Sequence, residues 1–277
     1  MTLVLLGTPI GNLEDLSPRA ARTLAEADVL ACEDTRRTRA LLTHLGVPAA
    51  GRLLSLHQHN EAAQVDKVLG HLAAGATVAL VSDAGMPTIS DPGSRLVRAV
   101  AGAGHRIEVV PGPSAVITAL AASGLDASRF CFEGFLPRKG RARAAVLEGL
   151  RQELRTTVLF EAPHRVRATV EELLGTLDAD RGLVVARELT KRFEEIWRGT
   201  LGTAVAHLAA SPPRGEHVLV LAGASAPTPA SEDQIADALR SRLVAGLDRR
   251  SAVAEVCREL GAPRNVVYPI ATRMERP

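Results

Sequence analysis

The chain has 277 residues, of which 46% are hydrophobic and 23% charged, and its formal net charge is +2. This length accommodates two modest domains, and the composition excludes a wholly disordered chain. Aromatic residues make up only 3% of the chain, which excludes a nucleic-acid surface built on a platform of stacked rings. The sequence shows no signal segment and no apolar run near the ~20 residues of a membrane span, so we expect a cytoplasmic protein with no membrane partner.

Strand-loop-helix units fill the first part of the chain. Apolar runs bounded by turn residues predict strands at Leu3–Leu6, Val29–Cys32, Leu53–Leu56, Val78–Val81 and Ile107–Val110. Between and after them, helices are predicted at Pro18–Ala27, Glu61–Ala74, Arg95–Ala103 and Ala115–Ser123. A further short helix is predicted to end with Leu41–Leu45. This repetition predicts an α/β fold whose N-terminal domain, residues 1–112, holds a doubly wound, mostly parallel sheet.

Polar, Gly and Pro residues follow each predicted strand, where open α/β sheets bind ligands. The first such loop, GTPIGN, does not fit the dinucleotide fingerprint GxGxxG, and the chain contains no P-loop motif. The stretch VALVSDAGMPTISDP places Ser82 and Asp83 directly after a buried strand, and Gly85 lets backbone approach a ligand closely. It is either a ligand-binding loop or a turn that caps the following helix.

The second half of the chain has a different pattern of elements. Strands are predicted at Phe130–Phe135, Thr157–Phe160, Leu183–Ala186, Glu195–Arg198 and Val218–Ala222. The strand Glu195–Arg198 is expected at an edge of the sheet. This pattern predicts a second α/β domain, residues 113–223, with a mixed sheet. A Pro/Ala/Ser linker follows at Ala222–Ser231. Residues 224–277 comprise this linker and a small helical tail, with helices at Ile235–Leu243 and Val253–Leu260 and a helix-turn-helix-like arrangement.

No metal site is predicted. The three cysteines are widely separated and fit free, buried thiols. His57, His59 and Glu61 could supply ligands, but without a partner cluster they are more typical of loop polar groups. Asp83 and Asp91 lack a third nearby carboxylate.

Positive charge is concentrated in a few short segments. Arg138–Arg143 carries four cations in six residues, a density that favours a mobile phosphate-binding arm over a helix face, although a solvated loop is the alternative. Further cations follow predicted strands at His164, Arg165, Arg187 and Lys191. If these segments face one crevice, a polyanionic substrate is favoured.

Taken in order, several motifs carry a family resemblance: GTPIGNLEDLSPRA, EDTRRT, SLHQHNE, VSDAGMPTISDPG, PGPSA, FLPRKGRAR, EAPHR and RELTKRFEEIWRGT. From about Leu3 to Gly223 the chain resembles the ribosomal RNA small-subunit methyltransferase I family, within the tetrapyrrole-methylase-like, class III S-adenosylmethionine (SAM) methyltransferases. The resemblance implies a homodimer of two-domain subunits with SAM in the cleft between the domains. It also implies methyl transfer to the ribose 2′-OH of a decoding-region cytidine in 16S rRNA, within the small ribosomal subunit.

The resemblance also implies site residues. SAM contacts are expected from Pro9, Gly11, Asp83, Ala84, Gly85, Ile89, Ser114, Ala115, Phe160, Ala162, Glu216 and His217. RNA contacts are expected from Arg36, Arg138, Lys139, Arg141, Arg143, His164, Arg165, Arg187 and Lys191. Candidate general bases are Asp34, Glu161 and Glu188, each beside an arginine that could instead make it a structural ion pair.

Two alternatives stay open. A small-molecule tetrapyrrole methylase would share the fold, although an Arg-rich arm suits a tetrapyrrole poorly. A non-catalytic RNA-binding factor could keep the fold and bind through its tail, although the first loop and the VSDAG loop are intact.

Overall fold

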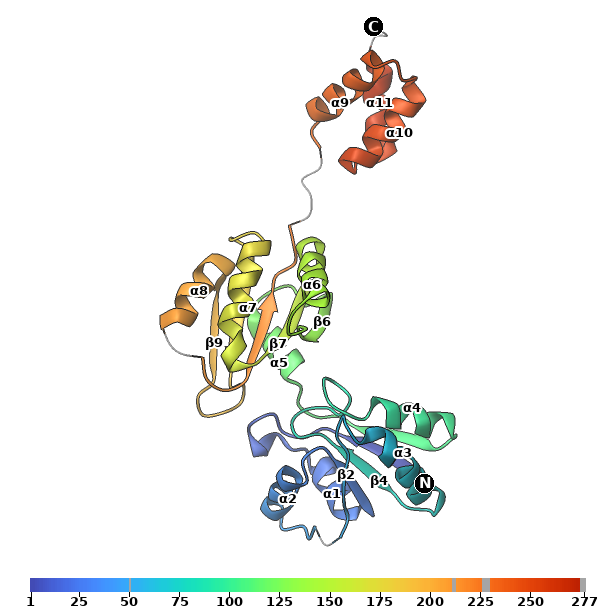
Figure 1. Ribbon diagram of the computed structural model, residues 1–277, viewed down its shortest axis with the longest axis vertical. Coiled ribbons are helices and arrows are strands. Elements are labelled where there is room, and N and C mark those ends of the chain that lie inside the picture. Colours follow the sequence, from blue (N-terminus) through green and yellow to red (C-terminus); the bar gives the residue numbers. More distant parts are fainter. Residues whose placement is uncertain (50, 211–212, 226–229, 275–277) are drawn as a thin grey trace. The chain divides into compact units, whose positions relative to one another are not determined.

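The computed structural model describes residues 1–49, 51–210, 213–225 and 230–274 (Figure 1). The chain divides into two compact units, Met1–Ala224 and Ser225–Pro277. The middle of the predicted linker, residues 226–229, lies outside the described residues. Among the helices of the described ranges, none has the length and apolar character needed to cross a membrane.

The first sheet contains parallel strands in the order β3-β2-β4-β1-β5. These strands are β1 (Thr2–Leu6), β2 (Val29–Cys32), β3 (Leu53–Ser55), β4 (Val78–Val81) and β5 (Arg106–Val110). All four residues of β4 are buried, as expected for a central strand covered on both faces. The predicted doubly wound parallel sheet is confirmed.

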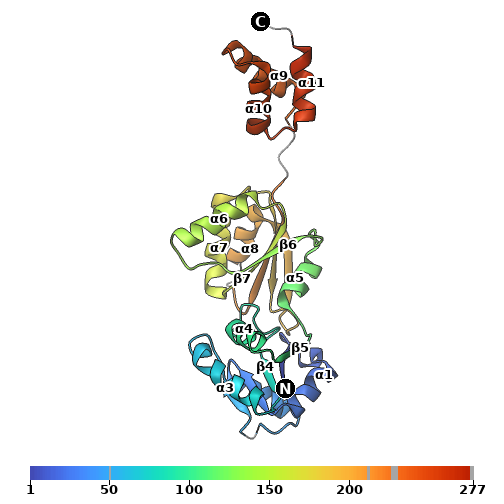
Figure 2. The ribbon, with the colours of Figure 1, turned by 90° about the vertical axis from the view of Figure 1, so that its right-hand side faces the viewer.

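Helices cover both faces of this sheet (Figure 2). On one face α1 (Pro18–Glu26) and α2 (Thr35–His44) bury Leu24 and Leu42 against Leu30. On the other, α3 (Glu61–Ala73) and α4 (Ser94–Gly102) bury Leu72 and Leu96 against Leu80. A short 3-10 helix, η1 (Leu13–Asp15), follows the first loop.

The second sheet has the order β6-β7-β10-β8-β9. Its strands are β6 (Phe130–Phe135), β7 (Thr156–Glu161), β8 (Gly182–Arg187), β9 (Glu195–Thr200) and β10 (His217–Leu221). β6 and β7 are parallel and the other neighbours antiparallel, so the predicted mixed sheet with β9 at an edge is confirmed. Helices α6 (Arg141–Gln152), α7 (Pro163–Thr176) and α8 (Leu201–Ala210) cover one face, and α5 (Ala115–Ser123) covers the other. Both sheets belong to one compact unit, so a domain boundary at residue 112 stays a prediction.

The second unit holds α9 (Glu232–Val244), α10 (Arg249–Leu260) and α11 (Arg264–Arg273), which share a core around Leu239, Val256 and Val267. Asp248 caps α10, because its carboxylate accepts the Ser251 N–H at 3.0 Å. Helix α11 was not predicted from the sequence. Pro269 lies inside it and lacks the N–H that a helix interior uses, which hides the helical pattern.

Candidate active site

Loops from the carboxyl ends of the first sheet are fastened to one another. Thr8 and Gly85 exchange backbone hydrogen bonds of 2.9 and 3.1 Å, and the Thr8 hydroxyl donates to the Ser82 carbonyl at 3.1 Å. A Cβ on Gly7 would lie 2.6 Å from the Gly112 Cα, so only glycine allows the β1 and β5 loops to approach this closely. The loops that follow β1, β4 and β5 therefore form one surface.

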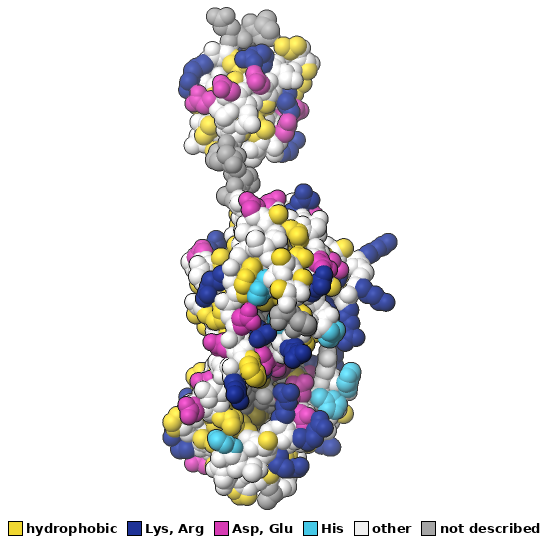
Figure 3. All heavy atoms as spheres, turned by 90° about the vertical axis from the view of Figure 1, so that its left-hand side faces the viewer, with side chains coloured by type: hydrophobic (Ala, Val, Ile, Leu, Met, Phe, Trp, Pro, Cys, Tyr) yellow, Lys and Arg dark blue, Asp and Glu magenta, His cyan; other side chains and the backbone are white. Residues whose placement is uncertain are grey.

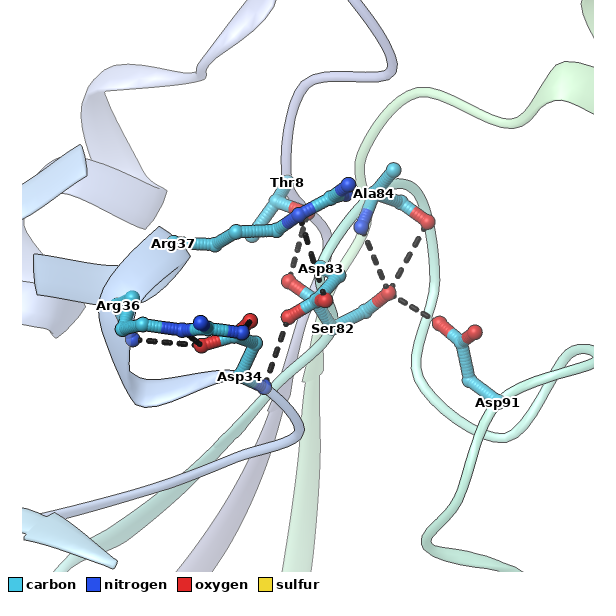
Figure 4. A network of polar contacts seen from close by, with 8 residues as sticks. All are labelled: Thr8, Asp34, Arg36, Arg37, Ser82, Asp83, Ala84 and Asp91. Carbon is cyan, nitrogen blue, oxygen red and sulfur yellow. Dashed lines mark hydrogen bonds and ion pairs between the residues drawn. The ribbon is translucent and has the colours of Figure 1, made fainter. Parts of the chain in front are cut away.

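The loop after β4 is held by a network around one serine (Figure 4). The Ser82 hydroxyl is hydrogen-bonded to the Asp91 carboxyl group, and it accepts the Ala84 N–H at 3.1 Å. Burial raises the pKa of Asp91, and the nearby charge of Asp83 adds to this, whereas the Ser82 hydrogen bond opposes it. Thr88 and Ser90 adopt positive φ angles of 75° and 59°, a strain that side-chain-bearing residues usually keep only at functional sites.

Glu61 anchors the far end of the same loop. Its buried Oε1 accepts the N–H groups of Gly93, Arg95 and Leu96 at 3.2, 2.7 and 3.1 Å, at the start of α4. Glu61 therefore caps a helix and is not turned toward His57 and His59. Within the described ranges, no cluster of three or more His, Cys, Asp or Glu side chains could hold a metal ion.

A first cavity of about 350 Å³ opens between these loops and the second sheet. Most of the predicted SAM contacts line it: Ala84, Gly85, Ile89, Ser114, Ala115, Phe160, Ala162, Glu216 and His217. The structure adds Asp91, Phe135 and Leu189, which were not assigned from the sequence. The paired Ser-Asp dipeptides of the β4 loop were the available signal for Asp91.

The first cavity has an acidic and apolar lining. Among the described residues that line it none is Lys or Arg, whereas Asp91, Glu161 and Glu216 are carboxylic acids. Burial lowers the pKa of His217, which keeps that imidazole neutral near pH 7. Such a lining suits a cationic ligand better than a polyanion.

A second cavity of about 360 Å³ adjoins the first and shares Ile10, Ala84 and Glu216 with it. Three residues that were predicted to contact SAM line the second cavity and not the first. They are Pro9, Gly11 and Asp83. Unlike the first cavity, the second has cationic side chains in its wall, Arg37 and Lys191.

The β8–β9 loop contributes Lys191 to the wall of the second cavity. A Cβ on Gly11 would lie 2.4 Å from the Lys191 Cγ, so the first loop touches this segment closely. Lys191 Nζ donates to Glu188 at 3.0 Å and to Glu216 at 2.9 Å, which fixes the lysine in the wall. Glu188 and Thr190 have positive φ angles of 50° and 65°, so this loop is strained as well.

Two of the three candidate bases have lowered pKa values. Hydrogen bonds from Arg36 lower the pKa of Asp34 to about 2. Burial opposes ionisation of Glu188, but hydrogen bonds from the Glu216 N–H and from Lys191 outweigh it, so its pKa is lowered. A carboxylate with a low pKa is a weak proton acceptor at neutral pH.

The third candidate, Glu161, is buried, and both of its carboxylate oxygens already accept hydrogen bonds. It accepts the Ala162 N–H at 2.9 Å and the Thr169 hydroxyl at 2.6 Å, and Arg165 Nε lies 3.3 Å from it. This arrangement makes Glu161 a support for the start of α7.

The prediction that Arg143 contacts RNA is wrong. Helix α6 begins at Arg141 and turns Arg143 inward, where its side chain is only 9% exposed. The guanidinium donates to Glu172 at 2.6 Å, to the Pro137 carbonyl at 3.0 Å and to Thr169 at 2.9 Å. The predicted mobile arm is therefore shorter than Arg138–Arg143.

The other predicted RNA contacts divide into two groups. The side chains of the first group are bonded within the protein. Arg165 donates to the Leu136 carbonyl and faces Glu161, and Arg187 pairs with Glu195 at 3.3 Å. Lys191 pairs with Glu188 and Glu216. Exposed side chains belong to Arg36, Arg138, Lys139, Arg141 and His164. Lys and Arg side chains are spread over one face of the first unit (Figure 3).

Comparisons with known proteins identify the family. The model of the tetrapyrrole (corrin/porphyrin) methylases matches residues 2–205. Proteins named ribosomal RNA small subunit methyltransferase I are similar to the chain: one from Synechocystis is 46% identical over 99% of this chain and 98% of its own, and one from Escherichia coli O157:H7 is 42% identical over 99% and 95%. A uroporphyrin-III C-methyltransferase from Thermus thermophilus, solved with S-adenosylhomocysteine, shares the fold with a TM-score of 0.57 at 21% identity, covering 80% of this chain and 96% of that one. The chain therefore belongs to the tetrapyrrole methylase family and, within it, to the ribosomal RNA small subunit methyltransferase I proteins.

Proposed function

We propose that this protein transfers a methyl group from SAM to the ribose 2′-OH of a decoding-region cytidine in 16S rRNA, within the small ribosomal subunit. The observation that carries the proposal is the pair of adjoining cavities, of which the first has only acidic charged side chains in its described lining and the second has both acidic and cationic ones. The first has carboxylates and no described Lys or Arg in its lining, which favours a cofactor with a positively charged sulfonium. The second has Arg37 and Lys191 in its wall beside Asp83 and Glu216, and the 61% exposed side chain of Arg37 is available to a phosphate-bearing substrate. The relatives are named ribosomal RNA small subunit methyltransferase I, which supports methyl transfer to that RNA.

The first cavity fits SAM on its own geometry. Its volume of about 350 Å³ lies in the range of small-molecule sites. Phe135 and Phe160, with ring centroids 5.6 Å apart, offer an apolar wall to an adenine ring, and Asp91 offers a carboxylate to positive charge. Bound SAM supplies an activated methyl group on its sulfonium, so no metal is required for the transfer.

The residues of this chain contribute mainly alignment. The Ser82 network and the Glu61 cap hold the β4 loop in one conformation, and Ile10 and Ala84 lie where the two cavities meet. Placing acceptor and donor in line accelerates transfer without any covalent participation by the protein. For Asp34, whose pKa is about 2, we expect Asp34→Asn to keep the single-turnover rate. A large loss of rate in that variant would restore Asp34 as a general base; Glu161→Gln and Glu188→Gln test the other two candidates in the same way.

The exposed cations extend the substrate surface beyond the second cavity. Arg138 and Lys139 precede α6, whose first residue is Arg141, and Arg36 and His164 are the second residues of α2 and α7. Their side chains are exposed, which leaves them accessible to phosphates, and the Arg36 guanidinium in addition pairs with Asp34 at 2.6 Å. We assign the grip on the RNA backbone to these five residues.

The proposal includes a homodimer that acts in the cytoplasm, where ribosomal subunits are assembled. Large apolar side chains are exposed on three consecutive elements: Val109 of β5 (46%), Ile117 of α5 (52%) and Phe130 of β6 (36%). β5 and β6 are also edge strands of their sheets. Apolar side chains at sheet edges are typical of subunit interfaces. Light scattering of the purified protein should give a molar mass twice that of the monomer.

Methyl transfer from labelled SAM to small ribosomal subunits that lack the modification tests the reaction. Mass spectrometry of the nucleosides should show the label in 2′-O-methylcytidine. SAM binding without transfer to subunits or naked rRNA would contradict the proposal and favour a small-molecule acceptor such as a tetrapyrrole. Loss of both SAM binding and transfer would favour a non-catalytic RNA-binding factor.

A further inference from the structure

We infer that the second cavity receives the acceptor nucleotide and that Asp83, paired with Arg37, selects cytosine by its Watson–Crick edge. This inference rests on the proposed function and assigns the base-reading residues within it. Enzymes that do chemistry on a base take its nucleotide out of the base stack into a pocket, and we apply the same reasoning to a nucleotide that is methylated on its ribose.

The position and size of the second cavity fit a single nucleotide. It measures about 360 Å³ and meets the first cavity at Ile10 and Ala84, so a ribose seated there would face the methyl donor. Leu13 and Leu41 line its wall and offer apolar surface to the faces of a base. Leu13 is an exposed large apolar side chain, at 44%, which a docked base would cover.

Asp83 and Arg37 present an acceptor beside a donor. Asp83 Oδ1 is already used, because it accepts the Asp34 N–H at 3.0 Å. Its Oδ2 lies 3.7 Å from Arg37 Nε, too long for a strong hydrogen bond, and keeps lone pairs for another donor (Figure 4). The Arg37 side chain is 61% exposed and reaches over Asp83 into the cavity wall.

This pattern is complementary to cytosine and opposed to uracil. Cytosine carries an amino donor at N4 next to an acceptor at N3, which match the Asp83 carboxylate and the Arg37 guanidinium in that order. Uracil carries a carbonyl oxygen at C4, which the carboxylate would repel, and a donor at N3, which the guanidinium would repel. An acidic side chain that accepts from the cytosine amino group is an established form of base recognition.

The experiment compares RNA fragments that carry either cytidine or uridine at the target position, with the full-length protein. Wild-type kcat/KM should favour cytidine by about tenfold or more, as one well-formed pair of base contacts allows. In Asp83→Asn, the amide oxygen can still accept the Asp34 N–H while the amide NH₂ faces the base, so the ratio should fall toward one. SAM affinity, measured by calorimetry, should stay unchanged. Asp66→Asn, on the exposed face of α3, is the matched control and should keep the wild-type ratio.

An unchanged ratio in Asp83→Asn would overturn the inference, and so would a loss of SAM affinity, which would place Asp83 in the cofactor site. Arg37→Ala is the second variant and should lower the ratio as well; if Asp83→Asn fails to fold, it decides the question. If the wild type transfers no methyl group either to these fragments or to small ribosomal subunits, the proposed function fails, and binding of the same RNAs in the presence of S-adenosylhomocysteine becomes the test. Equal binding of the two RNAs by the wild type would then refute the inference, and a cytidine preference that Asp83→Asn abolishes would support it.

Discussion

Replacing Glu61 with alanine should destabilise the first unit and weaken SAM binding together. One buried carboxylate oxygen accepts the first N–H groups of α4, and Gly93 at the N-cap has no side chain to replace it. The variant leaves the N–H groups of Gly93 and Leu96, both buried, without this acceptor. Buried donors without partners cost roughly 1–3 kcal/mol each, and a lost helix cap about 0.5–2 kcal/mol. Because the three bonds share one oxygen, we expect a total loss of about 3 kcal/mol.

Urea unfolding, followed by circular dichroism and by the fluorescence of Trp197, the only tryptophan in the chain, measures this loss. For a unit of this size, about 3 kcal/mol corresponds to a decrease of about 6–12 °C in Tm. Glu61→Gln keeps an oxygen acceptor and should lose only about 1 kcal/mol. Asp66→Ala, on an exposed position of the same helix, should change stability by less than ~0.5 kcal/mol.

The SAM affinity of Glu61→Ala should fall several-fold, because the freed start of α4 releases the loop that carries Asp91. The binding measurement is made at a temperature where the variant is fully folded. A loss of stability below ~1 kcal/mol would refute the capping argument. An undiminished SAM affinity in a clearly destabilised variant would show that the loop keeps its shape without the cap.

Three further predictions concern the rest of the site. Replacing Arg138 and Lys139 with glutamine should weaken RNA binding and reduce its salt slope by about 2, with SAM affinity unchanged; an unchanged slope would remove both from the interface. Gly11→Ala should lower methyl transfer strongly, because its Cβ would meet the Lys191 Cγ at 2.4 Å; wild-type kinetics would contradict this. Burial lowers the pKa of His217, so the unfolded chain binds a proton that the folded chain does not, and stability should fall as pH drops below about 6.5. His217→Gln should flatten this dependence in urea midpoints measured from about pH 5 to pH 7.

The order and type of the strands and α-helices up to α5, and of the strands of the second sheet, could be read from the sequence because the strands are short apolar runs between turn residues. Val29–Cys32, Val78–Val81 and Phe130–Phe135 have the predicted bounds. Helices α1, α3 and α5 also begin where predicted, at Pro18, Glu61 and Ala115, but α2 was harder to place. It begins at Thr35, with Asp34 as its cap, six residues before the apolar Leu41 that marked it in the sequence. The polar first turn of a surface helix has no apolar period to reveal it.

The lining of the first cavity was predictable to a greater extent than that of the second. Residues next to a strand end, such as Ala84 and Ser114, must lie at the edge of the sheet wherever their loops go. Pro9, Gly11 and Asp83 also lie at that edge, but which of two adjoining cavities they line depends on how α2 and the β8–β9 loop pack against them. Contacts between segments so far apart in the chain leave no local pattern in the sequence.

Charge density predicted where cations lie but not which of them are available to a substrate. Arg138 and Arg143 belong to one basic segment. The Arg143 guanidinium is hydrogen-bonded to Glu172 and Thr169, whereas the Arg138 side chain is exposed. The same holds for Lys191, whose charge is balanced by two glutamates. A paired cation fixes the shape of a wall, and an exposed one can exchange water for phosphate at little cost. RNA affinity should therefore depend on the exposed residues, and the geometry of methyl transfer on the paired ones.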